Sequence, residues 1–546
     1  MNINKNKNRR HFYLTSFILI LSIALVSFLA YKDILDNYFS GIDTFTLIET
    51  SQIHSFKDIT RIFTERMTGG TAFLKAAKFY RPIAVLSYGI DYLIWKLNPL
   101  GYHLTDLMLH IFASVLVFLL IRFLTAGKQI TAWIGAIVFT LHPILVESVP
   151  VNARRHDILA SIFIMLAFLM FLEYRSEEFK HKLFLIFSIL FYLLALGSKE
   201  IALIFPLLIF CYLMVFGSAG KKPFWGVLNF IIKKCFPYLM VTLIFILWRS
   251  YVLQGIGGYT RAAADRSAFF QDFITIITNY FLNLFVPSQS VNSFFNPPGI
   301  LIMLAVVTGL LLFFLIILWF SGKFNFKMCS NDSKRLRSWK MLLFSLAWLL
   351  LPLIIYIWAQ KFSARYMYIA IIPFSIMLSV CIAEGFHWGF KRLKSGSRHP
   401  SCSSFIFSFI HIKTVGFILV LCLTLSLLLN SPLLKRNKEW EESSSMSAMF
   451  FQKLVKVIPG FPNDANINIY ALPAKAYIRQ HSISSWLNLK YPGNRYQVVV
   501  KSILKNHANA NQLYLKVKKR DKKNFAIFCR IKKGQNRDHR PKKRIS

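Results

Sequence analysis

Apolar runs of about 20 residues recur along the chain, and they limit its fold more than any other feature. A helix of roughly that length crosses a hydrocarbon core of ~30 Å, because each residue rises about 1.5 Å. We therefore predict an all-α polytopic membrane protein with about eleven transmembrane helices. The predicted helices cover residues 12–31, 104–123, 130–146, 158–174, 182–197, 200–216, 236–253, 299–320, 341–358, 366–385 and 414–430.

The distribution of positive charge predicts how these helices are oriented. Residues 1–11 carry Lys5, Lys7, Arg9 and Arg10, and the apolar run that follows is longer than that of a signal peptide. We expect a retained first helix with a cytoplasmic N-terminus. Alternation from this start places the short loops rich in Lys and Arg inside, as the positive-inside rule requires. These loops are 122–129, 175–182, 217–235, 321–340 and 386–413.

One further apolar segment, 268–286, contains Asp272, Asn279 and Asn283. Counting it as a crossing would move the basic residues of 321–340 to the outside, against the charge rule. We therefore predict a re-entrant or interfacial helix here.

The composition agrees with a membrane protein. Hydrophobic residues make up 55% of the 546 residues, the mean hydropathy is +0.48, and the chain contains 53 Phe. This apolar content excludes an intrinsically disordered chain. The formal net charge is +41, yet a nucleic-acid-binding protein rarely has such a hydrophobic composition. We expect no nucleic-acid partner.

Residues 431–546 differ in composition from the rest and follow the last predicted helix. They carry 25 Lys and Arg against 6 Asp and Glu. Eleven crossings from an inside start place this region outside. Segments 467–472 and 496–500 have the pattern of strands and 443–457 that of a helix, which predicts a small extracytoplasmic α+β domain over 431–515. Residues 516–546 are so basic that we expect a charged tail.

Ionisable residues gather in two predicted outer loops of the membrane domain 12–430, which are 32–103 and 145–157. Charged groups at membrane depth are costly and mark functional sites. A transporter would be expected to place them near the bilayer midplane on interrupted helices related by repeats, and no convincing repeat is visible. The sequence therefore predicts an active site at the membrane–water boundary.

The first outer loop contains an amphipathic segment, 55–67. Ser55 and Asp58 have the spacing of a capping box, and the apolar residues recur with helical period. Such a helix would lie flat on the membrane or pack on neighbouring protein, and the sequence does not choose between the two.

Five motifs in order resemble the TMTC-like and protein O-mannosyltransferase-like members of the GT-C glycosyltransferase superfamily. They extend over most of residues 30–460. The motifs are FYRPIAVLSYGIDYLIWKLNPLGYHLTDLMLH at 79–110, LHPILVESVPVNARRHDILA at 141–160, GSKEIALIFPLLI at 197–209, FSARYMYIAIIPF at 362–374 and NKEWEESSSMSAMFF at 437–451.

The resemblance implies an enzyme of the bacterial inner membrane that moves a hexosyl, mannosyl-like sugar. Such enzymes transfer it from a polyprenyl-phosphate carrier to a glycan, lipid or protein acceptor on the outer face, usually with inversion. The tetratricopeptide repeats of the larger members are not visible here, since no helical repeat of about 34 residues occurs in the tail. The closer likeness is to repeat-less bacterial members.

The resemblance also implies a catalytic base in the first outer loop. The family often has an Asp-Asp pair there, whereas this chain has Asp43 preceded by Ile42. A single carboxylate suffices for inverting transfer, because one base takes the acceptor's proton. Asp36 is a substitute candidate, and a solvated loop carboxylate is the alternative for Asp43.

A polyprenyl phosphate leaving group needs fixed positive charge, which guanidinium supplies well. Arg154, Arg155, Lys199 and Arg365 are the predicted phosphate-binding residues. Each also has a structural alternative. Arg365 could snorkel to the headgroups, Arg154 and Arg155 could pair with Asp157 and Glu147, and Lys199 could pair with Glu200.

The remaining motif residues are predicted to position acceptor and sugar. Asp43, His142 and Asp157 would also suit a divalent cation, the one cofactor the sequence suggests. His110 lies one heptad after His103 and is expected to pack or contact sugar. The positioning residues are Arg81, His103, His142, Glu147, Asp157, Glu200 and Tyr366.

Two other functions remain open at this stage. A lipid-linked saccharide flippase or transporter would move its substrate without forming a glycosidic bond. A non-catalytic GT-C-like scaffold would fit the missing second acid beside Asp43.

Overall fold

The structure is a computed structural model of the whole chain. It describes residues 2–39, 41–69, 79–175, 182–217, 224–258, 266–285, 333–359, 362–395, 432–457, 466–470, 472–473, 478–492, 496–501, 503–504, 512–519 and 524–532.

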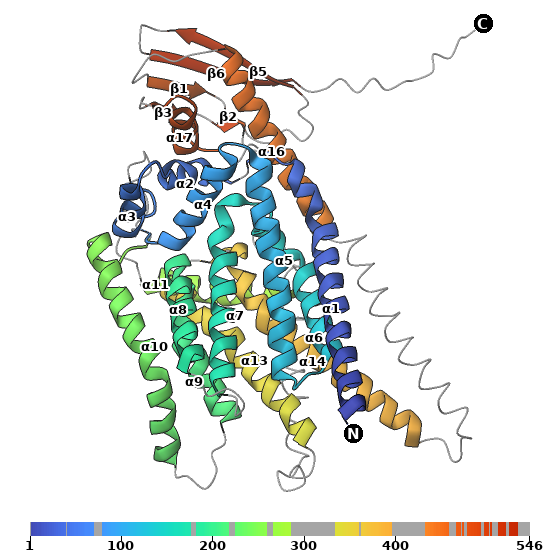
Figure 1. Cartoon of the computed structure of the whole chain (residues 1–546). Helices are drawn as coiled ribbons and strands as arrows, with labels where there is room; N and C mark the ends of the chain where they lie inside the picture. Colours follow the sequence, from blue (N-terminus) through green and yellow to red (C-terminus); the bar gives the residue numbers. More distant parts are fainter. Residues whose placement is uncertain are drawn as a thin grey trace, which may run out of the picture.

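A bundle of apolar helices forms the body of the molecule (Figure 1). Its elements in chain order are α1 (Asn2–Tyr31), α5 (Pro99–Leu124), α6 (Gln129–Leu141), α7 (Arg155–Arg175), α8 (Lys182–Ser198), η4 (Glu200–Ile204), α9 (Phe205–Phe216), α10 (Phe224–Leu253), α11 (Arg266–Phe285), α13 (Ser333–Trp358), η7 (Ala364–Met367) and α14 (Tyr368–Ser395).

Six helices in the described part of the chain are long and apolar enough to cross a membrane. They confirm six of the predicted spans, and the protein is an integral membrane protein. The predicted spans 130–146, 182–197 and 200–216 form shorter apolar helices, and those at 299–320 and 414–430 lie outside the described residues. The six are Phe12–Asp36, Pro99–Leu124, Asn152–Arg175, Trp225–Leu253, Leu336–Trp358 and Ala364–Glu384.

Helix α11 covers the segment that was expected to be re-entrant or interfacial. It is helical over Arg266–Phe285, and it is not among the six long apolar helices. The Tyr280 hydroxyl donates to the carbonyl of Leu349 on α13 at 2.5 Å, so α11 packs against the bundle.

Small polar contacts and stacked rings hold the bundle together. The indole of Trp133 on α6 donates to the Ser22 hydroxyl on α1 at 2.9 Å. On α7, the ring of Phe168 stacks on Phe344 of α13 at 5.6 Å between centroids. Inside a membrane, where lipid is as apolar as the side chains, such packing and interhelical hydrogen bonds drive helix association.

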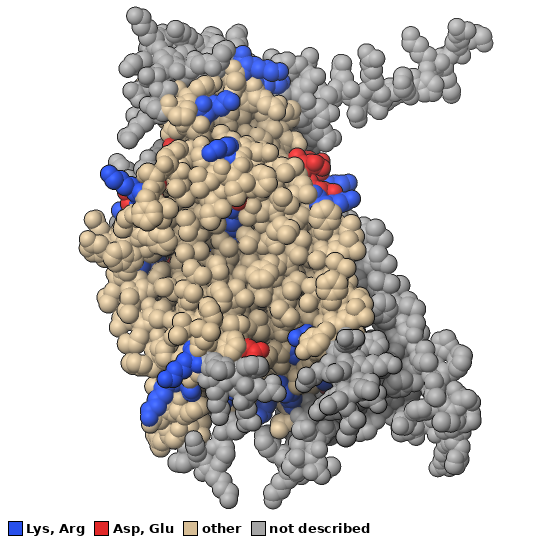
Figure 2. Space-filling model, in the orientation of Figure 1, with Lys and Arg blue, Asp and Glu red and all other residues tan. Residues whose placement is uncertain are grey.

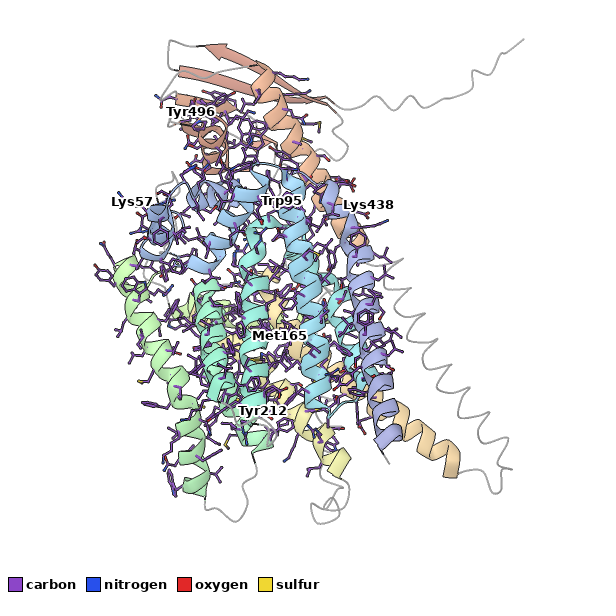
Figure 3. The ribbon with its side chains drawn as sticks, in the orientation of Figure 1. Lys57, Trp95, Met165, Tyr212, Lys438 and Tyr496 are labelled. Atoms are coloured by element: carbon purple, nitrogen blue, oxygen red, sulfur yellow. The ribbon has the colours of Figure 1, made fainter. Side chains whose placement is uncertain are left out.

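Charge separates along the bundle, and Figure 2 shows charged side chains toward the two ends of this face with a broad, mostly uncharged band between them. Labelled side chains mark the middle and one end of the bundle. In Figure 3, Met165 on α7 lies among the bundle helices, whereas Trp95 lies at the end that carries the C-terminal domain.

Three helices cover that end between α1 and α5, after the short η1 (Lys32–Asp36). They are α2 (Thr44–Ser51), α3 (Phe56–Thr64) and α4 (Pro82–Trp95). The predicted helix over 55–67 is confirmed as α3, with the capping box of Ser55 and Asp58 present. Ile62 of this helix is buried while Phe56 is exposed, and α3 packs on α4.

The region predicted as the second outer loop, 145–157, contains two short turns, η2 (Pro143–Glu147) and η3 (Asn152–Arg154). It leads directly into α7, which begins at Arg155. The loop is well buried, because Val146, Val149, Val151 and Ala153 all lie in the core.

The C-terminal domain is α+β and sits on the α2–α4 end of the bundle (Figure 1). A four-stranded sheet has the order β3-β1-β6-β5, in which β1 is parallel to β3 and β6 while β5 and β6 are antiparallel. The elements are α16 (Pro432–Val457), β1 (Asn466–Tyr470), β2 (Leu472–Pro473), α17 (Gln480–Lys490), β3 (Gln497–Val500), β4 (Ile503–Leu504), β5 (Gln512–Lys519) and β6 (Asn524–Lys532).

The sheet continues beyond residue 515, where a charged tail was expected. β5 and β6 pair along their length, from Gln512 with Lys532 to Lys519 with Phe525. The sequence LYLKVKK alternates apolar and polar or basic residues, which is the pattern of a half-buried strand. The high charge of this segment concealed the period, and the boundary at 515 stays a prediction.

Candidate active site

One pocket with about 570 Å³ of empty space lies where the segment between α1 and α5, which carries α2, α3 and α4 and is called the outer segment below, meets η3 and η7. It brings together five residues that the sequence singled out: Asp43, Arg81, Arg154, Arg365 and Tyr366. They come from four separate parts of the chain and meet only through the fold. The complete lining is Asp43, Thr46, Leu47, Met67, Thr68, Phe79, Arg81, Ala153, Arg154, His156, Arg365 and Tyr366.

A tight turn places Asp43 at the pocket. Gly41 has φ +98°, and a Cβ there would come within 2.8 Å of Val151, so only glycine lets the chain pass so close to the second outer loop. Asp43 then occupies the N-cap position of α2, but its side chain makes no capping hydrogen bond. The Asp43 carboxylate therefore does not cap α2 and can interact with other groups at the pocket.

The Asp43 carboxylate is partnered by His481 of α17 in the C-terminal domain. His481 Nε2 lies 3.3 Å from Asp43 Oδ1, and the Asp43 side chain is 36% exposed. Burial alone would raise the pKa of Asp43. The hydrogen bond from His481 and the positive charges of Arg154 and Arg365 outweigh burial, so the pKa is lower than the ordinary value. Asp43 is thus an ionised carboxylate that can accept a proton.

Three guanidinium groups line the same pocket. Arg154 ends η3 and Arg365 lies in η7, where its guanidinium carbon is 5.1 Å from the centre of the Tyr366 ring. Arg81 precedes α4, and its Nη2 donates to Glu200 Oε2 at 2.7 Å. Guanidinium groups bind phosphate oxygens bidentately and keep their charge, so this pocket suits an anion.

Lys199 lies behind the pocket and is not part of its lining. Its ammonium contacts Asp157 Oδ1 and lies 4.4 Å from the centre of the Tyr366 ring. His156 Nε2 is 3.2 Å from the other oxygen of Asp157. Burial lowers the pKa of Lys199 to about 8, although Asp157 opposes the shift. Asp157 therefore serves as a buried counter-ion that supports the wall formed by Tyr366 and His156.

Arg155 does not reach the pocket, contrary to its predicted role in phosphate binding. It is completely buried, with Nη2 2.6 Å from Asp91 Oδ2 and Nε 2.5 Å from Asp106 Oδ1. The Tyr88 ring lies 4.7 Å from its guanidinium carbon. Two buried carboxylates need this charge, so Arg155 is structural. Its partners are not Asp157 and Glu147, the ones that the sequence suggested.

Five of the seven predicted positioning residues lie outside the pocket lining, namely His103, His142, Glu147, Asp157 and Glu200. His103 is buried, with Nε2 3.2 Å from the carbonyl of Tyr38, and His142 Nε2 is 3.0 Å from the carbonyl of Leu284. His110 packs against Tyr31 and Tyr368, as the packing alternative proposed. Glu147 is half-buried at the end of η2.

Lys199 and Glu200 do not pair with each other, although such a pair was the structural alternative for Lys199. Lys199 pairs with Asp157, whereas Glu200 pairs with Arg81 and lies 3.7 Å from Arg249. The two neighbouring side chains thus support different parts of the pocket. Asp36, considered as a substitute base, is exposed and does not line the pocket.

The predicted cation ligands are not brought together. Among the described residues, no group of three His, Cys, Asp or Glu side chains could hold a metal ion. Asp43 contacts His481, His142 contacts Leu284, and Asp157 contacts Lys199, so the three act separately.

Sequence reasoning missed two residues of this site. His156 lies in the first turn of α7 and lines the pocket, but no site role was predicted for it. His481 is separated from Asp43 by more than four hundred residues, and nothing in its local sequence indicates a site. A contact that depends on domain docking leaves no periodic signal in the chain.

No protein-family model matches the chain. It is similar to the mouse protein O-mannosyl-transferase TMTC3, with 28% identity over 137 residues that cover 25% of this chain and 15% of that protein. It is also similar to the Drosophila melanogaster protein O-mannosyl-transferase Tmtc1, with 37% identity over 125 residues that cover 23% of this chain and 14% of that protein.

Among solved structures, the chain is similar to ArnT from Cupriavidus metallidurans in the apo state. The TM-score is 0.46 and the identity 11%, covering 89% of this chain and 85% of that one. The same protein bound to undecaprenyl phosphate gives a TM-score of 0.47 and 12% identity, with the same coverage. The sequence matches cover only about a seventh of the curated relatives, and they confirm the resemblance to the TMTC protein O-mannosyl-transferases.

Proposed function

We propose that the protein is a GT-C-type glycosyltransferase that transfers a sugar from a polyprenyl-phosphate carrier to an acceptor at the extracytoplasmic face. The observation that carries this proposal is the pocket in which an ionised Asp43 faces the guanidinium groups of Arg81, Arg154 and Arg365. The relatives named as protein O-mannosyl-transferases support a mannosyl-like sugar. The proposed location is the bacterial inner membrane, with a cytoplasmic N-terminus.

The proposed reaction is a single displacement with inversion. The hydroxyl oxygen of the acceptor attacks the anomeric carbon, and Asp43 takes its proton. The bond between the anomeric carbon and the phosphate oxygen breaks, and the lipid phosphate leaves with the electron pair. Such a base contributes about 10²- to 10⁴-fold to the rate. One carboxylate is enough, so the missing second acid beside Asp43 does not prevent the reaction.

The arginines are proposed to stabilise the phosphate as negative charge develops on it. Arg154 and Arg365 both act electrostatically on Asp43, so the base and the anion site share one pocket. Arg81 is partly neutralised by Glu200, which fixes its guanidinium at the pocket wall. Fixed donors of this kind need no rearrangement when the charge appears, and they stabilise it more than water would.

This geometry favours an enzyme over the two alternatives. The pocket residues lie at helix starts and connecting segments, whereas a transporter would be expected to use broken helices near the midplane. A non-catalytic scaffold would not need an ionised carboxylate next to three arginines in one pocket, whereas such groups are typical of active sites.

The test is Asp43→Asn in proteoliposomes that contain the purified chain, isotopically labelled polyprenyl-phosphate mannose and a membrane extract as acceptor. We expect transfer of label to fall at least about 100-fold. Asp36→Asn is the matched control, because Asp36 is an exposed acid of the same outer segment, and it should leave transfer unchanged. Full transfer by Asp43→Asn would overturn the proposal, as would movement of the labelled lipid across the bilayer without any new glycosidic product.

A further inference from the structure

The C-terminal domain contacts the pocket through one helix, α17, which lies against α2. His481, Ser485 and Asn488 are spaced four and three residues apart, so they share one face of α17. That face meets α2 and the turn before it. Ser485 Oγ is 3.2 Å from Thr46 Oγ1, and Asn488 Nδ2 donates to Glu49 Oε1 at 2.7 Å.

Aromatic packing fixes α17 from its other side. The ring of Trp486 stacks on Phe451 of α16 with 4.5 Å between centroids, and its indole nitrogen is 3.3 Å from the Tyr38 hydroxyl. The backbone N–H of Tyr38 in turn donates to the Ser444 hydroxyl on α16 at 2.8 Å. The domain is therefore held on the outer segment by several contacts that do not involve His481.

We propose that His481 is a positioning residue for Asp43, so that the C-terminal domain completes the catalytic pocket of the membrane domain. This inference rests on the proposed role of Asp43 as base. A carboxylate only accepts hydrogen bonds, so His481 Nε2 donates to Asp43 Oδ1. The bond fixes the plane of the carboxylate and leaves Oδ2 to take the proton of the acceptor.

The surroundings of the pair fit this role. Asp43 at the N-cap position would otherwise be free to turn back and cap α2, which it does not do. Arg154 and Arg365 act on the carboxylate from the membrane domain, and His481 holds it from the opposite, C-terminal domain. Glu49, the other acid of α2 facing α17, is bound by Asn488 and does not compete for His481.

The kinetic test compares three variants of the full chain. His481→Ala should lower kcat for sugar transfer roughly 10- to 100-fold with little change in KM for the labelled donor lipid. His481→Gln keeps an N–H donor and should recover part of kcat. Asn488→Ala removes a docking hydrogen bond from the same face of α17 without touching Asp43, and it should stay close to wild type.

A double variant separates positioning from folding. If His481 acts only through Asp43, Asp43→Asn with His481→Ala should be no slower than Asp43→Asn alone. Additive losses, or equal losses in His481→Ala and Asn488→Ala, would overturn the inference. If Asp43→Asn is inactive while His481→Ala keeps its full kcat, the inference fails and the proposed function stands.

A second measurement needs no sugar. A water-soluble carbodiimide modifies protonated carboxyl groups, and mass spectrometry of the peptide that contains Asp43 reports the extent. Loss of the hydrogen bond should move half-maximal labelling of Asp43 to higher pH in His481→Ala and leave it unchanged in Asn488→Ala. Identical labelling curves in both variants would overturn the positioning role, whatever the outcome for sugar transfer.

Discussion

Arg155 and Asp106 form a buried ion pair in which Nε lies 2.5 Å from Oδ1 and neither side chain reaches solvent. Arg154, the preceding residue, lines the pocket instead. Arg154 is the last residue of η3 and Arg155 the first of α7, and their side chains have different surroundings. One stabilises the fold, and the other supplies charge to the proposed site.

Replacing Arg155 by Met should destabilise the protein strongly. It would leave Asp91 and Asp106 as unpaired buried carboxylates, a loss of about 3–5 kcal/mol. Thermal unfolding of the purified protein in detergent would measure it. Lys128→Met removes the exposed pair with Glu384 and should cost only about 0–1 kcal/mol. Equal melting temperatures for both variants would show that the buried network is not structural.

Arg154→Gln and Arg365→Gln should weaken binding of the donor lipid. Each removes a charged donor from the pocket, and a hydrogen bond to a charged group is worth about 1.5–3 kcal/mol, or at least about tenfold in apparent KM. Arg122→Gln is the control, because Arg122 lies near the other end of α5 and donates to Ser16. If the pocket variants and the control gave the same KM, the arginines would not bind the donor.

The pH dependence of transfer should report on Lys199. Burial brings its pKa down to about 8, so the ammonium loses its proton as the pH rises through 8. The Tyr366 ring then loses its contact with the Lys199 ammonium, and Asp157 loses its positively charged partner. We expect transfer to decline above pH 8 in the wild type. Lys199→Arg keeps its charge at all these pH values, so its decline should move to higher pH. An unchanged alkaline limb in this variant would assign it to another group.

The contact between Asp43 and His481 also bears on topology. Two residues that touch outside the membrane must lie on the same side, so the chain crosses an even number of times between them. Ten of the predicted spans lie between these positions. Two of these ten, 299–320 and 414–430, lie outside the described residues, so the re-entrant or interfacial placement of α11 stays a prediction.

Much of the architecture could be predicted from local patterns. Apolar runs predicted the long helices because a membrane-spanning helix must be apolar over its whole length. The capping box at Ser55 and Asp58 predicted α3, since both partners lie within one turn. Strands β5 and β6 were missed because basic residues masked their alternating period.

The candidate site was predictable only in part. The sequence by itself predicted a membrane protein whose ionisable residues gather at one end, because charge at membrane depth is costly. The motifs that resemble the GT-C family then named Asp43, Arg81, Arg154, Arg365 and Tyr366. Only the tertiary structure decided which charges meet. In the folded chain Arg155 and His103 are buried away from the pocket, and His481 of a separate domain contacts Asp43. The partners of a side chain depend on how the helices pack together, and no short stretch of sequence specifies that packing.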